Sequence, residues 1–161
     1  MKLKFLWIED GAIADYQTML GPVFVSGKYD PVIALNVADG IRQLRQSRFD
    51  AVIVDIRLPP GESSEWARLY DESRQNKATA RLGLKVLYCL LGPGEEDIRI
   101  EGMPDWVKPD RFGVLTVENK SELQEDLDRL GIRVYRQKTA RTPNNVLIDM
   151  IEEIKRQMQT E

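Results

Sequence analysis

The stretch FDAVIVDIRLPPG at residues 49–61 decides the fold of this chain. Residues 49–56 are almost all apolar and rich in β-branched side chains, interrupted only by Asp50 and Asp55, which is typical of a strand buried in a parallel sheet. The following LPPG at 58–61 favours a turn, because proline and glycine readily adopt turn conformations. We therefore predict a buried strand with one carboxylate, that of Asp55, at its end.

Outside this stretch, short apolar runs alternate with segments whose apolar residues recur at helical spacing. The predicted strands cover 3–8, 31–36, 49–56, 84–91, 112–117 and 132–138. The predicted helices cover 11–20, a segment beginning near Val37, 62–76 with Trp66, Leu69 and Tyr70 inside, 121–130 and 143–158. We expect Gly21-Pro22 to end the first helix, and Thr142-Pro143 to begin the last one as N-cap and first helical residue.

This alternation predicts an α/β fold, a doubly wound parallel sheet with helices on both faces. We expect residues 1–161 to form a single domain. In open parallel sheets, ligands bind outside the carboxyl ends of the strands, so the side chains at those ends are the candidates for function.

The composition limits the chemistry that the chain can perform. Its 161 residues suffice for a real core, and its net charge of −3 disfavours non-specific binding to nucleic acid. The chain lacks histidine and has one cysteine, Cys89, which excludes disulfide frameworks, multi-thiolate metal sites, histidine triads and phosphohistidine carriers. No apolar segment approaches the roughly 18 residues of a membrane span, and the N-terminal apolar run is too short for a signal peptide. We therefore expect a cytoplasmic protein.

Five polar residues follow or end the predicted strands, namely Glu9, Asp10, Asp55, Thr116 and Lys138. Three carboxylates in one crevice repel one another unless a cation holds them ionised. Mg²⁺ suits such a site, because it prefers oxygen ligands. A carboxylate beside Mg²⁺ can attack phosphorus and form an aspartyl phosphate, a reaction that needs mainly positioning and charge neutralisation.

The chain resembles the receiver domains of two-component response regulators. The matching segments are LKFLWIED at 3–10, FDAVIVDIRLPPG at 49–61, VLTVE at 114–118 and YRQK at 135–138. The separations of 45 residues between Asp10 and Asp55, and of 22 between Thr116 and Lys138, are also those of the family. The resemblance implies a CheY-like (βα)5 fold with strand order 2-1-3-4-5.

The resemblance also implies a role for each matching residue. Glu9, Asp10 and Asp55 would hold Mg²⁺ together with the backbone carbonyl of Arg57, Asp55 would be the phosphoacceptor, Thr116 the switch hydroxyl, Lys138 the active-site lysine and Tyr135 the aromatic switch residue. The implied protein is a stand-alone receiver in a phosphorelay, not an enzyme beyond Mg²⁺-dependent self-phosphorylation and autodephosphorylation. Its partners would be a histidine kinase or phosphotransfer protein and a downstream protein target that reads residues 119–158, with no nucleic acid or membrane. The family also leaves room for a homodimer.

Two features depart from the family pattern. The interval of 61 residues from Asp55 to Thr116 is long, which predicts an insertion at about 77–111 that contains an extra strand, 84–91. A competing alignment makes 84–91 the fourth strand and Lys108 the active-site lysine, but it leaves too few residues for a helical crossover. The second departure is Thr139, which follows Lys138 where the family has a proline in a cis peptide. A cis bond there would cost roughly 2.5–4 kcal/mol, so the bond is either trans or strained.

Two alternative functions come from other classes. A pseudo-receiver would use the same fold as a phosphorylation-independent interaction module, and the insertion and Thr139 motivate this hypothesis. A hydrolase with an aspartate nucleophile usually carries a second aspartate just beyond the first, whereas Arg57 and Leu58 follow Ile56 here.

Overall fold

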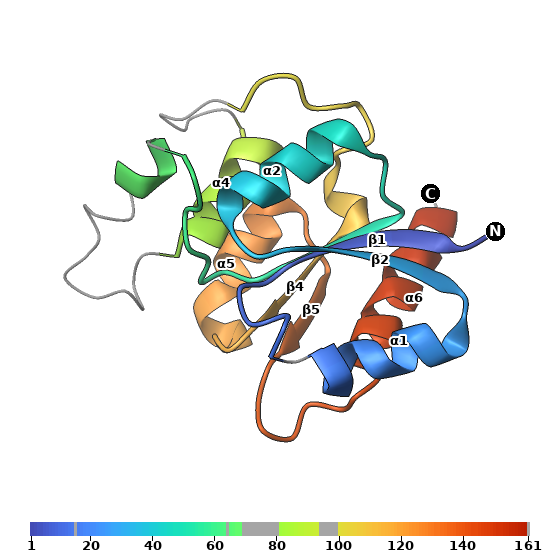
Figure 1. Cartoon of the computed structure of the whole chain (residues 1–161). Helices are drawn as coiled ribbons and strands as arrows, with labels where there is room; N and C mark the ends of the chain where they lie inside the picture. The colour runs from blue at the N-terminus through green and yellow to red at the C-terminus, as the bar shows by residue number, and fades with distance from the viewer. Residues whose placement is uncertain (15, 64, 69–80, 94–99, 161) are drawn as a thin grey trace.

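The computed structural model describes residues 1–14, 16–63, 65–68, 81–93 and 100–160. A parallel sheet of five strands in the order β2-β1-β3-β4-β5 forms its centre (Figure 1). The strands are β1 (Leu3–Ile8), β2 (Tyr29–Ala34), β3 (Ala51–Val54), β4 (Phe112–Thr116) and β5 (Val134–Gln137). This topology confirms the predicted doubly wound α/β fold with strand order 2-1-3-4-5.

Helices cover both faces of the sheet (Figure 1). One face is covered by α1 (Gly21–Ser26), which continues a π-helical turn, η1 (Tyr16–Leu20), and by α6 (Val146–Gln159). The other face is covered by α2 (Val37–Gln46), α4 (Leu82–Leu91) and α5 (Lys120–Leu130), and a short 3-10 helix, η3 (Pro109–Arg111), leads into β4. Among the described residues, no helix is long and apolar enough to cross a bilayer.

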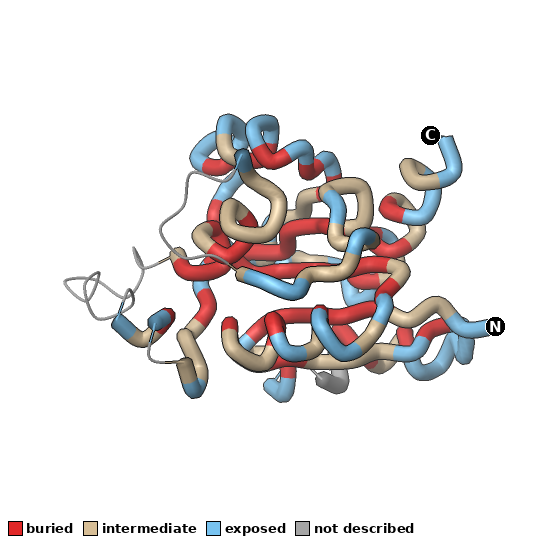
Figure 2. The backbone as a smooth tube through the Cα atoms, turned by 90° about the horizontal axis from the view of Figure 1, so that it is seen from above, coloured by how far each residue is buried: buried red, intermediate tan, exposed pale blue. Residues whose placement is uncertain are grey.

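The alternation of side chains along β1 divides the core into two layers. Leu6 and Ile8 pack on the α2, α4 and α5 side, whereas Phe5 and Trp7 pack on the α1 and α6 side. All four side chains are buried, and buried residues run through the centre of the molecule (Figure 2). This double burial explains why the strands read as continuous apolar runs. It also leaves the carboxyl ends of the strands as the place for polar side chains.

The segment 84–91 is a helix, so the prediction of a strand there was wrong. Periodicity alone does not distinguish a short, continuous apolar run in a strand from one in a buried helix. In α4 the buried residues include Leu84 and Leu87, and Gly92 follows the last turn. The helix lies between β3 and β4 in the chain and supplies the crossover that two parallel strands require. The predicted extra strand is therefore absent from the described part of 77–111, and the inserted segment itself stays a prediction.

The predicted end of the first helix was also wrong. Gly21 and Pro22 begin α1 rather than ending a helix, because proline fits the first turn, and Gly27 ends α1 with a φ of 69°. Of the helix predicted at 62–76, the structure describes residues 65–68 as helical, with Trp66 buried, whereas Leu69 and Tyr70 lie outside the described residues.

The last helix begins three residues later than predicted. It starts at Val146 with Asn145 as N-cap. The hydroxyl of Thr142 is engaged elsewhere, because it accepts a hydrogen bond from the N–H of Thr139 at 2.7 Å and donates to the carbonyl of Gln137. Thr142 therefore closes a turn after β5 instead of capping α6.

Candidate functional site

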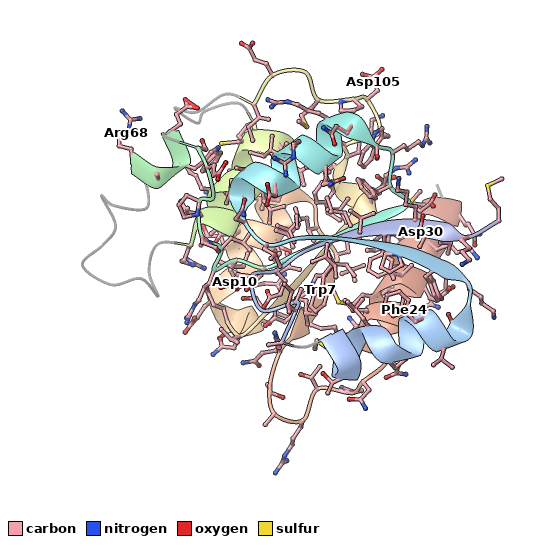
Figure 3. The ribbon with its side chains drawn as sticks, viewed as in Figure 1. Trp7, Asp10, Phe24, Asp30, Arg68 and Asp105 are labelled. Atoms are coloured by element: carbon pink, nitrogen blue, oxygen red, sulfur yellow. The ribbon has the colours of Figure 1, made fainter. Side chains whose placement is uncertain are left out.

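Three carboxylates meet at the carboxyl end of the sheet. Because Ile8 of β1 lies beside Val54 of β3, the residues that follow them, Glu9 and Asp55, become neighbours. Asp10 comes next in the chain and lies at the end of β1 (Figure 3). Glu9, Asp10 and Asp55 each offer an oxygen atom within 4.8 Å of the others. The sequence therefore placed the acidic cluster correctly.

Glu9 is the most constrained of the three acids. Its side chain is 6% exposed, and Lys138 Nζ lies 3.1 Å from Glu9 Oε1. Burial and the nearby Asp55 carboxylate raise the pKa of Glu9 to about 8, and the ammonium of Lys138 opposes this rise. The other oxygen, Oε2, is buried and has no hydrogen-bond partner among the described residues. Such an oxygen suits a bound cation, so the donor set fits Mg²⁺.

Thr116 and Lys138 approach the cluster from the two strands beyond β3. Thr116 ends β4 and is fully buried. Lys138 follows β5, and its N–H donates to the carbonyl of Thr116 at 2.7 Å, which extends the pairing of β4 with β5 by one residue. The sheet thus brings an acidic pair, an aspartate, a hydroxyl and an ammonium to one edge.

Solved structures with this architecture identify the fold. No family model matches the sequence. No curated protein matches it either. A CheY-like receiver domain from Methanospirillum hungatei JF-1 matches at a TM-score of 0.55 and 15% identity, covering 100% of both chains. A response regulator from Thermotoga maritima matches at 0.56 and 14%, covering 96% of this chain and 98% of that one. This chain has the receiver-domain fold.

One further matching structure contains a phosphorylated aspartic acid. A response regulator from Burkholderia pseudomallei, solved with a phosphorylated aspartic acid, a calcium ion and citrate, matches at a TM-score of 0.56 and 19% identity, covering 98% of this chain and 73% of that one. All of these identities are low, so the likeness concerns the fold.

The receiver fold decides between the two lysines that the sequence left open. Lys108 precedes η3 and so lies before β4 begins, whereas Asp55 follows the end of β3. Because β3 and β4 are parallel, Lys108 and Asp55 lie at opposite ends of the sheet. Lys138 is the lysine at the acidic cluster. No cis peptide occurs among the described residues, so the Lys138–Thr139 bond is trans.

Arg57 lies beside Asp55, and Tyr135 contacts the segment that follows Thr116. The N–H of Arg57 is 3.4 Å from Asp55 Oδ1. The role of the Arg57 carbonyl as a metal ligand stays a prediction. The half-buried Tyr135 donates its hydroxyl hydrogen to the carbonyl of Glu118, and burial together with the charges of Glu118 and Glu122 raises the pKa of the Tyr135 phenol.

Glu118 is a feature of the site that the sequence analysis missed. It lies two residues after Thr116, and it is buried although it is charged. Its carboxylate pairs with Arg81 at 2.9 Å and with Arg57 at 3.4 Å. The sequence contained the residue within VLTVE, but the arginines that compensate its charge come from distant segments. From the sequence alone, Glu118 could not be distinguished from an acidic residue that is exposed to solvent.

The N-terminal end of α4 packs directly against the Asp55 peptide. The N–H of Gly83 donates to the carbonyl of Ile56 at 2.9 Å. A Cβ atom at position 83 would lie 1.9 Å from the carbonyl oxygen of Asp55, so only glycine fits there. The backbone of Asp55, the candidate phosphoacceptor, is therefore held by β3 on one side and by α4 on the other.

Proposed function

We propose that the chain accepts a phosphoryl group on Asp55 and signals its phosphorylation state to a partner protein. The observation that carries this proposal is the convergence of Glu9, Asp10 and Asp55 at one end of the sheet, with Lys138 in contact with Glu9. An aspartate in that surrounding can act as a nucleophile once neighbouring cations balance the charge of the cluster.

Each residue has a task in this reaction. An oxygen of Asp55 attacks phosphorus, an O–P bond forms, and the bond from phosphorus to the donor breaks. Lys138 and the hydroxyl of Thr116 bind phosphoryl oxygens, and Glu9, Asp10 and Asp55, with the carbonyl of Arg57, would hold Mg²⁺. When bound, Mg²⁺ supplies positive charge that offsets the three carboxylates and the incoming phosphoryl group. The donor would be a histidine kinase or a phosphotransfer protein.

Phosphorylation would change the protein through its added charge and acceptor oxygens. Thr116 would turn to bond the phosphoryl group, and Tyr135 would follow inward. The hydroxyl of Tyr135 now bonds the carbonyl of Glu118, so its inward motion requires that bond to break. The downstream partner would read the surface that includes α5, β5 and α6.

Phosphorylation by a small phosphodonor tests this proposal. The purified chain is incubated with radiolabelled acetyl phosphate and Mg²⁺, and the incorporated label is measured. We expect label in the wild type and none in Asp55→Asn. Asp50→Asn is the matched control, because Asp50 precedes the same strand at its other end and bonds the N–H of Lys4. Incorporation that persists in Asp55→Asn, or that is absent from the wild type with every donor including a kinase, would overturn the proposal.

A pseudo-receiver is the second candidate, and one observation favours it. The Lys138–Thr139 peptide bond is trans, whereas the family has a cis peptide at this point. Mg²⁺ titration separates the two functions. Trp7 is fully buried two residues before Glu9 (Figure 3), so we expect its fluorescence to respond to a cation bound at the cluster. A response to millimolar Mg²⁺ that disappears in Trp7→Phe supports the phosphoacceptor, and an unchanged signal supports the pseudo-receiver.

A further inference from the structure

The carboxylate of Glu118 holds arginines from two other loops at the edge of the acidic site. Its side chain is 3% exposed. Arg81, the N-cap residue of α4, approaches Oε1 with Nη2 at 2.9 Å and Oε2 with Nε at 3.3 Å. Arg57, in the loop after β3, approaches Oε2 with Nε at 3.4 Å. Because a buried charge must be paired, this carboxylate holds both arginine side chains in place.

The backbone of Glu118 contacts the two residues that would respond to phosphorylation. Its N–H lies 3.5 Å from Thr116 Oγ1, and its carbonyl accepts a hydrogen bond from the hydroxyl of Tyr135. One residue therefore contacts the switch pair through its main chain and α4 through its side chain. A motion of Thr116 or Tyr135 therefore removes a hydrogen bond from the backbone of Glu118.

The start of α4 is held in an unfavourable conformation. Arg81 has a φ of 42° and is the one described non-glycine residue with a positive φ. A left-handed conformation is costly for a residue with a side chain, so surrounding contacts must stabilise it. The ion pair with Glu118, in which Nε of Arg81 donates a hydrogen bond to Oε2, is such a contact. If this contact between Arg81 and Glu118 breaks, the left-handed conformation of Arg81 is no longer stabilised, and the first turn of α4 can change conformation.

We propose that Glu118 and Arg81 form a latch that transmits the phosphorylation state of Asp55 to α4. The inference rests on the proposed function. When Thr116 turns toward a phosphoryl group on Asp55, it gives up the N–H of Glu118. The Glu118 carboxylate then moves away from Arg81, and the N-terminal turn of α4 becomes less stable. The responsive surface then includes α4 in addition to residues 119–158.

Amide hydrogen exchange with beryllofluoride as the phosphoryl mimic tests the latch. The full chain is compared with and without Mg²⁺ and beryllofluoride, and exchange is followed at residues 83–87. We expect exchange there to quicken about tenfold in the wild type when the mimic binds. In Glu118→Gln, exchange should be quick without the mimic, and the mimic should bind about tenfold more tightly, because no latch has to open first.

Two further variants serve as a second test of the latch and as its control. Arg81→Gly removes the guanidinium but accepts the positive φ without strain, so it should fold and should reproduce the tighter binding. Glu125→Gln is the matched control, because Glu125 forms an exposed pair with Arg129 on α5. It should behave as the wild type does.

The outcomes separate the latch from the proposed function. If the wild type binds the mimic but exchange at 83–87 does not change, or if both latch variants bind it with wild-type affinity, the latch is refuted and the phosphoacceptor stands. If the wild type does not bind the mimic with Mg²⁺, the proposed function is refuted, and the latch with it.

Discussion

Replacing Glu9 by glutamine should stabilise the metal-free protein, and the gain should grow with pH. The pKa of Glu9 is raised from 4.5 to about 8 in the folded chain. Between these values the folded state keeps a proton that the unfolded state has released. The stability of the wild type therefore falls as pH rises through this window and the loss is complete above about pH 8. Glutamine has no proton to release.

The size of the effect follows from the size of the shift. The difference between 4.5 and about 8, at 1.36 kcal/mol per unit, corresponds to about 5 kcal/mol. The glutamine amide still accepts a hydrogen bond from Lys138, but it carries no charge. The weaker contact reduces the expected gain in stability by about 1 kcal/mol. We expect the two proteins to be equally stable near pH 5, and Glu9→Gln to be more stable by about 4 kcal/mol at pH 8.5.

Urea unfolding in the presence of EDTA, measured at several pH values from 5 to 8.5, provides the assay. Glu101→Gln is the control, because Glu101 is exposed and its backbone carbonyl, which the substitution keeps, accepts the hydrogen bond from Arg45. Adding Mg²⁺ should stabilise the wild type more than Glu9→Gln and reduce the difference. A difference that does not change with pH, or a variant that becomes less stable than the wild type as pH rises, would refute the reasoning.

Two further substitutions test a close packing contact beside Asp55 and a hydrogen bond between β2 and α6. Gly83→Ala should destabilise the chain by about 1–3 kcal/mol, because the new methyl group would lie 1.9 Å from the backbone oxygen of Asp55. Gly21→Ala is the control. Its methyl group would meet nothing within 4 Å, so the urea midpoint should not change. Equal midpoints for the two variants would contradict this. Tyr29→Phe removes a 2.5 Å hydrogen bond to Glu152 and should lower the free energy of unfolding by about 1 kcal/mol, seen as a lower urea midpoint at an unchanged slope; an unchanged midpoint would show that this bond contributes nothing.

The buried strands could be predicted because their side chains face a core on both sides of the sheet. Burial of β3 on both faces produces the continuous run at 49–56, and parallel pairing then requires the residues after β1 and β3 to meet. The positions of Glu9 and Asp55 follow from this rule alone. Thr116 and Lys138 were found by the same rule, at the ends of their predicted strands, and the resemblance to a known family added their roles.

The same reasoning failed where local signals allow two structures. The run at 84–91 is as apolar as a strand, and nothing within it shows that it must serve as the crossover from β3 to β4. The Gly21-Pro22 pair is as compatible with the start of a helix as with its end. Glu118 could not be assigned, since its partners Arg57 and Arg81 are 61 and 37 residues away. Long-range pairing of this kind is a property of the fold.

Two buried glutamates show how charge balance separates a binding site from a structural contact. Glu118 carries one negative charge against two guanidinium groups, and both of its carboxylate oxygens are paired, so it needs nothing further. Glu9 shares one ammonium with two other acids and keeps one buried oxygen without a partner. The repulsion in that cluster lowers the stability of the metal-free protein, and the same repulsion favours the binding of a cation. The instability predicted for the Glu9 site and the metal binding proposed for it therefore have the same cause, which is the repulsion among the three carboxylates.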